Sequence, residues 1–216
     1  MAIRALFPTY YLAASLKRPG WERLNLALGD ECRALALSDP AGRRWSARHY
    51  HGGYTSYGSH DQLHLLSPPF DRLRRLIDPD VAAFARALHY DLRGKMLAMT
   101  DCWANVMPAG VTHSLHLHPS SFISGTYYVE VPKGASALKF EDPRLGLHMA
   151  TPPRRVDAPP RLKSFVSVPA KAGDLVLFES WLRHEVPSAR FTGERISISF
   201  NYGWMAKPAA KSARRR

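Results

Sequence analysis

The spacing of apolar residues in the first 94 positions is mostly helical. The clearest pattern covers residues 78–90, where apolar side chains recur on one face of a helix. These side chains are Val81, Phe84, Ala85 and Leu88. Asp78 is a favourable N-cap and Pro79 suits the first helical position, so a helix is predicted to begin there. A second helix is predicted over residues 21–37, although Gly29 weakens it.

From about residue 95 onward the pattern changes to short apolar runs separated by Pro and Gly. These runs predict strands at residues 96–106, 121–131, 138–140, 165–168, 174–178 and 195–202. Short strands that follow one or two helices are typical of a β-sandwich or jelly roll with helices packed outside. Residues 143–163 contain five prolines and are expected to form an irregular loop, placed as a lid beside the cavity.

Length and composition indicate one domain. The chain has 216 residues, of which 45% are hydrophobic, enough for one sizeable core. We therefore predict a single domain over residues 1–206, with a helical or mixed part at 1–94 and a jelly-roll core at 95–206. Residues 207–216 carry five positive charges and no negative ones, and are expected to form a disordered basic tail.

The remaining charge affects the choice of partners. The formal net charge is +12, but outside the tail the basic residues are scattered and do not form a stripe with interleaved aromatic residues. Nucleic acid is therefore not the expected partner, although a nucleic-acid-binding protein is a third class to test. No apolar run of about 18 residues is present and the N-terminus does not resemble a leader, so a cytoplasmic protein without membrane contact is expected. A homodimer is left open.

Histidine and cysteine content suggests a metal site built on imidazole. Cys32 and Cys102 lie far apart in the chain, so they predict neither a disulfide framework nor a cysteine-based zinc site. His116 and His118 are separated by one residue, and in an extended backbone both rings project from the same face. His184 is the candidate distal ligand. An isolated His-x-His pair is more often structural than metal-binding.

A carboxylate receptor is predicted downstream of His184. Along residues 195–200, Arg195 and Ser197 fall on one face of the strand, and the apolar residues fall on the other. Arg195 can bind a carboxylate with two parallel hydrogen bonds, and Ser197 can add a third. In the alternative interpretation Arg195 forms a structural ion pair with Glu194 or Glu185. His113 is expected to line the site without binding metal.

Three sequence blocks together resemble a known family. They are His116 to Val129 (HLHPSSFISGTYYV), Phe140 to Arg144 (FEDPR), and Gly173 to Pro187 with Glu194 to Asn201 (GDLVLFESWLRHEVP and ERISISFN). The combined match resembles the 2-oxoglutarate/Fe(II)-dependent oxygenases of bacteria and phages. It covers roughly residues 95–204, and residues 53–57 also resemble that group.

The resemblance implies a mainly β fold with flanking helices, a double-stranded β-helix (jelly roll, cupin-like). It also implies Fe(II) held by His116, His118 and His184. The cosubstrate 2-oxoglutarate would bind through Arg195 and Ser197, in a pocket lined by Asn105 and Tyr128.

One departure from the family pattern affects the metal. Most of the superfamily presents His-x-Asp or His-x-Glu, and here the position of that carboxylate is occupied by His118. Either three neutral histidines hold the iron, or Asp142 or Glu141 supplies the carboxylate. Three-histidine iron also occurs in cupin-like dioxygenases that need no 2-oxoglutarate, which leaves such an enzyme as an alternative.

The predicted activity is hydroxylation of an unidentified small molecule or protein, with O2 consumed and 2-oxoglutarate converted to succinate and CO2. Trp103, Phe122, Tyr128 and Trp181 are candidates to surround the site, although each has ordinary core packing as its simpler explanation. A non-catalytic metal-binding module is the alternative from another class, and its site would be closed by four protein ligands.

Overall fold

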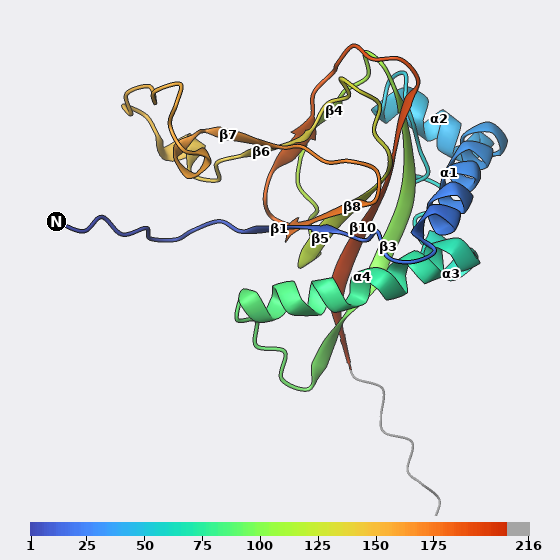
Figure 1. Ribbon diagram of the computed structural model, residues 1–216, viewed down its shortest axis with the longest axis horizontal. Coiled ribbons are helices and arrows are strands. Elements are labelled where there is room, and N and C mark those ends of the chain that lie inside the picture. The colour runs from blue at the N-terminus through green and yellow to red at the C-terminus, as the bar shows by residue number, and fades with distance from the viewer. Residues whose placement is uncertain (207–216) are drawn as a thin grey trace, which may run out of the picture.

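The computed structural model describes residues 1–206 and places two antiparallel β-sheets face to face (Figure 1). The larger sheet has six strands in the order β1-β8-β5-β10-β3-β2. In chain order they are β1 (Tyr11–Ser15), β2 (Tyr54–Thr55), β3 (Lys95–Pro108), β5 (Ile123–Glu130), β8 (Asp174–Glu179) and β10 (Glu194–Ala206).

The smaller sheet has four strands in the order β4-β9-β6-β7. They are β4 (His113–His116), β6 (Leu138–Glu141), β7 (Phe165–Val168) and β9 (His184–Val186). Most neighbours in each sheet are strands that do not follow one another in the sequence, as in a jelly roll. The predicted mainly β fold with flanking helices is confirmed. The basic tail predicted at residues 207–216 lies outside the described residues.

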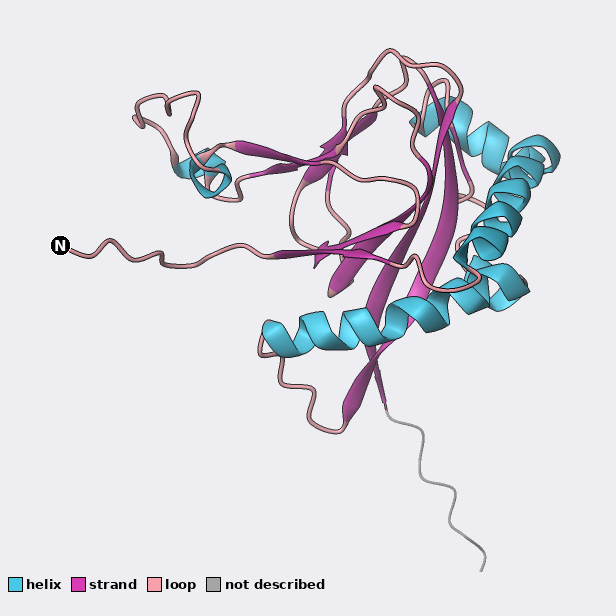
Figure 2. Cartoon of the chain, in the orientation of Figure 1, coloured by secondary structure: helices cyan, strands magenta, loops and turns pink. Residues whose placement is uncertain are grey.

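Helices cover the outer face of the larger sheet (Figure 2). They are α1 (Trp21–Ser38), α2 (Pro40–His49), the single turn α3 (Leu63–Leu66) and α4 (Pro68–Ala87). The helix predicted at residues 21–37 is confirmed by α1. No helix in residues 1–206 has the length and apolar character that crossing a membrane requires.

The predicted start of a helix at Asp78 is wrong, because α4 begins ten residues earlier at Pro68 and contains Pro79 in its interior. Pro79 has no N–H to donate to the carbonyl of Arg75. Both residues are exposed, so water can hydrogen-bond that carbonyl and the helix continues. The apolar face of α4 also extends upstream to Phe70 and Leu73, which are buried.

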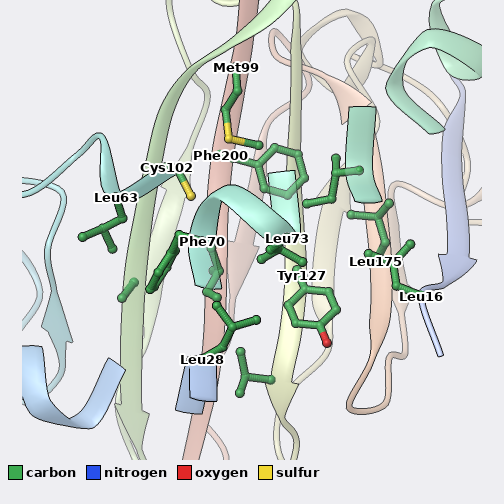
Figure 3. Close-up of a cluster of buried hydrophobic side chains, with 14 of the residues drawn as sticks. Leu16, Leu28, Leu63, Phe70, Leu73, Met99, Cys102, Tyr127, Leu175 and Phe200 are labelled. Carbon is green, nitrogen blue, oxygen red and sulfur yellow. The ribbon is translucent and has the colours of Figure 1, made fainter. Parts of the chain in front are cut away.

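The side chains of strand β10 point alternately into the apolar core beneath the helices and into the space between the two sheets. Ile196, Ile198 and Phe200 face the helices and join a cluster of buried side chains from α1, α4, β3, β5 and β8, part of which Figure 3 shows. Arg195 and Ser197 point to the opposite side, between the two sheets. Successive strand residues face opposite ways, so one strand supplies both a dry core and a polar cavity wall.

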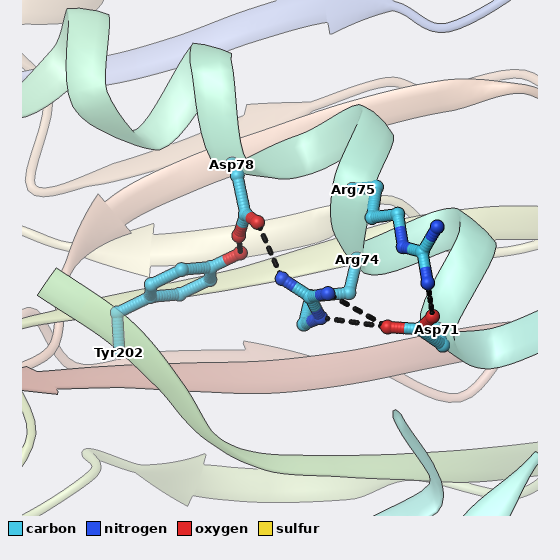
Figure 4. A network of polar contacts seen from close by, with 5 residues as sticks. All are labelled: Asp71, Arg74, Arg75, Asp78 and Tyr202. Carbon is cyan, nitrogen blue, oxygen red and sulfur yellow. Dashed lines mark hydrogen bonds and ion pairs between the residues drawn. The ribbon is translucent and has the colours of Figure 1, made fainter. Parts of the chain in front are cut away.

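A polar network fastens α4 to the larger sheet (Figure 4). The hydroxyl of Tyr202 on β10 donates to Asp78 Oδ1 at 2.7 Å, and Arg74 Nη1 donates to Asp78 Oδ2 at 2.6 Å. Arg74 also contacts Asp71 one turn earlier. The phenol of Tyr202 therefore links the helix to the strand whose other face lines the cavity.

The β6–β7 hairpin projects away from the two sheets and carries the proline-rich loop at its tip (Figure 1). The loop is irregular, with two short 3-10 turns at Leu145–Leu147 and Pro160–Leu162. The predicted lid is wrong, because none of the residues that line the cavity comes from residues 143–163. The hairpin instead extends the smaller sheet beyond the sandwich.

Candidate active site

Three histidines meet at one end of the space between the sheets. His116 on β4 and His184 on β9 are register partners in the smaller sheet. His118 follows β4, and its backbone N–H donates to Ser180 O at 3.0 Å, which fixes the chain just past the strand. Each ring offers one nitrogen to a group whose members all lie within 4.8 Å of one another. The histidines that the sequence singled out are therefore brought together.

Hydrogen bonds at Nδ1 determine which nitrogen of each ring is free. His116 Nδ1 lies 2.6 Å from Ser114 O, and His184 Nδ1 lies 2.9 Å from Leu182 O. His118 Nδ1 lies 2.6 Å from Asn201 Oδ1. Carbonyl and amide oxygens only accept, so each ring carries its proton on Nδ1 and keeps a lone pair on Nε2.

The free nitrogens of His116 and His118 are close together, with 3.3 Å between the two Nε2 atoms. Two lone pairs at this distance repel unless a cation lies between them. Ligating histidines commonly donate their other ring N–H to an oxygen, as these rings do. The donor set therefore fits a divalent transition metal such as Fe(II).

The site keeps its imidazoles neutral. Burial lowers the pKa of His184 to about 2 and that of His118 to about 4. Burial also lowers the pKa of His116 and lowers that of His113 to about 3. Neutral imidazole is the form that binds a metal, so the rings need not lose a proton first.

Neither carboxylate weighed as a metal ligand lies in the cluster of three histidines. Glu141 is paired with Arg183 at 2.8 Å, and Asp142 with Arg144 at 2.9 Å. His113 lines the cavity and stacks on His116 with 4.5 Å between ring centroids, but it is not part of the cluster either. Among residues 1–206 the donor set is three histidines.

A buried cation lies beyond the histidines in the same cavity. Arg195 is 3% exposed, its Nη1 donates to Ser197 Oγ at 3.2 Å, and its guanidinium lies 5.1 Å from the centroid of the Tyr128 ring. Within the described residues it has no acidic partner, and the two weighed candidates pair elsewhere, Glu185 with Lys139 at 2.8 Å and Glu194 with Arg33 at 3.8 Å. The alternative of a structural ion pair at Arg195 is therefore not what the structure has.

Three buried polar atoms in or directly behind the cavity wall have no hydrogen-bond partner among residues 1–206. They are Arg195 Nε, the Tyr128 hydroxyl and Asn105 Oδ1. Buried polar groups are nearly always satisfied, so unsatisfied ones around a cation indicate a missing polar ligand. A carboxylate provides the acceptors that Arg195 and Tyr128 lack. The wall therefore fits the distal carboxylate of a dicarboxylate.

The expected aromatic surround is only partly present. Trp103 lines the cavity and lies 5.7 Å from His118 between ring centroids, and Tyr128 is buried beside Arg195. Phe122 and Trp181 are partly exposed, at 37% and 46%, and do not line the cavity. For these two residues the expectation is wrong, because they lie at strand ends where the side chain faces solvent.

Tyr50 and Asn201 are residues of the site that were not identified from the sequence. Tyr50, at the end of α2, lines the cavity and packs on His113 with 5.0 Å between centroids. Asn201 accepts from His118. Nothing in the local sequence marks Tyr50, because its helix reaches the cavity only through tertiary packing. Asn201 was visible as the end of the polar face that begins at Arg195.

Comparison with known proteins agrees with this geometry. The sequence profile of the family described as "Putative 2OG-Fe(II) oxygenase" matches residues 101–201, which hold all three histidines and Arg195. No curated protein sequence matches the chain.

Solved structures share the fold. A prolyl-4-hydroxylase from Pseudomonas putida is 19% identical, with 90% of this chain and 92% of that one covered and a TM-score of 0.58. The alpha ketoglutarate dependent epimerase SnoN from nogalamycin biosynthesis is 19% identical, with 91% and 77% covered and a TM-score of 0.61. HygX from Streptomyces hygroscopicus, with nickel, 2-oxoglutarate and hygromycin B bound, is 16% identical, with 91% and 83% covered and a TM-score of 0.59. The double-stranded β-helix is thereby confirmed.

Proposed function

We propose that the chain is a 2-oxoglutarate/Fe(II) oxygenase, because residues 101–201 match the profile of that family, and that it hydroxylates its substrate at a three-histidine iron site. His116, His118 and His184 are the proposed ligands. The proposed residues for 2-oxoglutarate are Arg195, Ser197 and Asn105, which line the cavity, and Tyr128, which lies beside the Arg195 guanidinium. The observation that carries the proposal is a cluster of free imidazole nitrogens that shares one cavity with a buried arginine, which has no acidic partner among residues 1–206.

Bound Fe(II) and 2-oxoglutarate would supply the chemistry by activating O2, placing one oxygen atom on the substrate and converting 2-oxoglutarate to succinate and CO2. The protein contributes binding and orientation. Three ligands on one side leave the other coordination positions open, as a catalytic site requires and a closed structural site does not.

Arg195 has the geometry to orient the cosubstrate. Its guanidinium offers two parallel N–H groups to the distal carboxylate, while Ser197 Oγ, 3.2 Å from its Nη1, adds a polar contact. The Tyr128 hydroxyl has no partner and can donate to the same group. Asn105, whose Nδ2 donates to Ser199 Oγ at 3.1 Å, presents its free Oδ1 to the cavity.

Apolar side chains keep water from the reaction. Leu138 and Val186 line the cavity from the smaller sheet, and the buried Phe178 lies 4.6 Å from His184 between ring centroids. A dry wall strengthens the hold of Arg195 on an anion and protects reactive species from side reactions.

The experiment is an anaerobic titration of purified protein with Fe(II) and then 2-oxoglutarate, followed by visible absorption. A weak charge-transfer band that needs both components is expected, and His184→Ala should abolish it. His60→Ala removes an exposed histidine and serves as the matched control. A band of unchanged strength in His184→Ala would refute the ligand assignment. Bound iron without any band would favour the three-histidine dioxygenase that needs no 2-oxoglutarate.

The proposal also covers the substrate, the cellular location and the partners of the protein. We expect a small molecule or a protein as substrate and a cytoplasmic location. Nucleic-acid binding is not expected, and steep salt dependence of binding that survives in His184→Ala would contradict this. A homodimer is testable by light scattering of the purified chain.

A further inference from the structure

Asp101, Asn201 and Ser124 form one row across three neighbouring strands. The register pairs Asn201 on β10 with Asp101 on β3 at one side and with Ser124 on β5 at the other. Residues directly opposite each other in a sheet share a face, which here is the face toward the cavity. Asn201 and Ser124 are buried, at 6% and 0% exposure. His118 contacts two members of the row through its Nδ1, namely Asn201 and Ser124.

The hydrogen bonds of this row fix the orientation of the Asn201 amide. Asn201 Nδ2 donates to Asp101 Oδ2 at 3.2 Å. A carboxylate only accepts, so the amide nitrogen must face Asp101 and the amide oxygen must face away from it. On that side Asn201 Oδ1 accepts from His118 Nδ1 at 2.6 Å and from Ser124 Oγ at 2.8 Å.

The charge at the start of the row has no cationic partner. Within residues 1–206 Asp101 takes part in no ion pair, and its other hydrogen bond comes from the neutral Thr100 hydroxyl at 2.7 Å. Its negative charge therefore polarises the Asn201 amide, whose oxygen becomes a stronger acceptor for the His118 N–H. Donation from Nδ1 to such an acceptor makes the opposite ring nitrogen a better metal ligand.

We propose that Asp101 and Asn201 are positioning residues that hold His118 as the Nδ1–H tautomer and strengthen its Nε2 as a metal donor. Most of the superfamily has a carboxylate at the position of His118. Here the negative charge of Asp101 acts on the site indirectly, because the Asn201 amide lies between Asp101 and His118. The inference rests on the proposed role of His118 as a ligand. A purely structural role would predict a change in stability alone.

The first test measures Co(II) affinity by calorimetry, because Co(II) is stable in air and prefers similar ligands. Asp101→Asn keeps the shape and the acceptor for Asn201 but removes the charge. We expect it to bind Co(II) about tenfold more weakly, as is common when a residue behind a ligand is changed. Asp91→Asn makes the same chemical change at an exposed site and should bind as the unaltered protein does.

The second test reads the tautomer of His118 in metal-free protein by long-range ¹H–¹⁵N correlation NMR. The unaltered protein should show a proton on Nδ1. Asn201→Leu removes the acceptor and leaves only the Ser124 hydroxyl, which can donate or accept, so a measurable fraction of Nε2–H tautomer should appear. Ser124→Ala keeps Asn201 and should retain the Nδ1–H form.

The outcomes separate this inference from the proposed function. Equal Co(II) affinity in Asp101→Asn and Asp91→Asn, with binding lost in His184→Ala, would overturn the positioning role and leave the metal site intact. If the unaltered protein binds no Co(II), the proposed function fails, and the NMR comparison still decides: an unchanged tautomer in Asn201→Leu overturns the inference. If Asn201→Leu does not fold, the affinity of Asp101→Asn decides.

Discussion

His116 and His184 are direct register partners across β4 and β9, and their ring centroids lie 4.3 Å apart. The pairing brings together two histidines from distant parts of the chain without any local motif joining them. A shift of one residue in this pairing would turn one ring to the opposite face of the sheet. The metal site therefore depends on the register of the smaller sheet as well as on residue identity.

Arg195→Lys should weaken 2-oxoglutarate binding by about tenfold, because an ammonium group cannot reproduce two parallel charge-assisted hydrogen bonds. The measurement is the anaerobic titration of the Fe(II) protein with 2-oxoglutarate. Arg183→Lys is the matched control, since Arg183 is half-exposed and pairs with Glu141 outside the cavity. Equal 2-oxoglutarate affinity in both variants would remove Arg195 from the pocket.

Gly125→Ala should destabilise the fold by about 1–3 kcal/mol, the usual cost of overpacking a core. A Cβ at Gly125 would lie 2.5 Å from Phe200 Cζ and 2.7 Å from Leu177 Cδ2, and both side chains are fully buried. Urea unfolding measures the effect. Gly146→Ala is the control because its Cβ would meet nothing within 4 Å. Similar losses in the two variants would contradict the packing argument.

Tyr202→Phe should reduce the free energy of unfolding by about 1 kcal/mol, the typical net value of one hydrogen bond. The change removes the 2.7 Å contact between the phenol and Asp78 Oδ1 and leaves the ring in place (Figure 4). Tyr10→Phe alters an exposed tyrosine and should have no effect in the same thermal or urea unfolding assay. An unchanged free energy of unfolding in Tyr202→Phe would mean that this contact does not stabilise the docking of α4.

The stability of the metal-free protein should fall in acid, partly because of His64. Burial lowers the pKa of His64, which is 4% exposed with Nδ1 unpartnered. Below about pH 6.5 the unfolded chain therefore binds more protons at this residue than the folded chain does. The stability from the neutral ring is present above that pH and is lost as the pH falls.

His64→Gln removes this titration and retains a hydrogen-bonding side chain. Relative to the variant, the unaltered protein should lose at most about 1.4 kcal/mol for each pH unit below 6.5. Urea unfolding at a series of pH values measures this difference. His60→Gln makes the same change at an exposed histidine and is the control. A constant difference between His64→Gln and the unaltered protein across the series would count against the assignment.

Much of the architecture could be predicted because the local spacing of apolar residues indicates where helices and strands form. The helix at residues 21–37 and the alternation of β10 follow from 3.6-residue and two-residue repeats. The start of α4 could not be found this way, because Asp78-Pro79 is a strong local start signal. Burial of Phe70 and Leu73 against the sheet outweighs that signal. Propensity is weak when tertiary packing opposes it.

The sequence by itself determined which functional groups are available, namely three imidazoles and an arginine, and which strands carry them. Side-chain type and the alternation of a strand are local properties, so they can be read without the fold. Only the tertiary structure decided that Arg195 has no acidic partner among residues 1–206, that Glu141 pairs with Arg183, and that Asn201 connects His118 to Asp101. These are contacts between residues far apart in the chain, and strand register, which brings them within hydrogen-bond distance, is set by the packing of the whole sandwich.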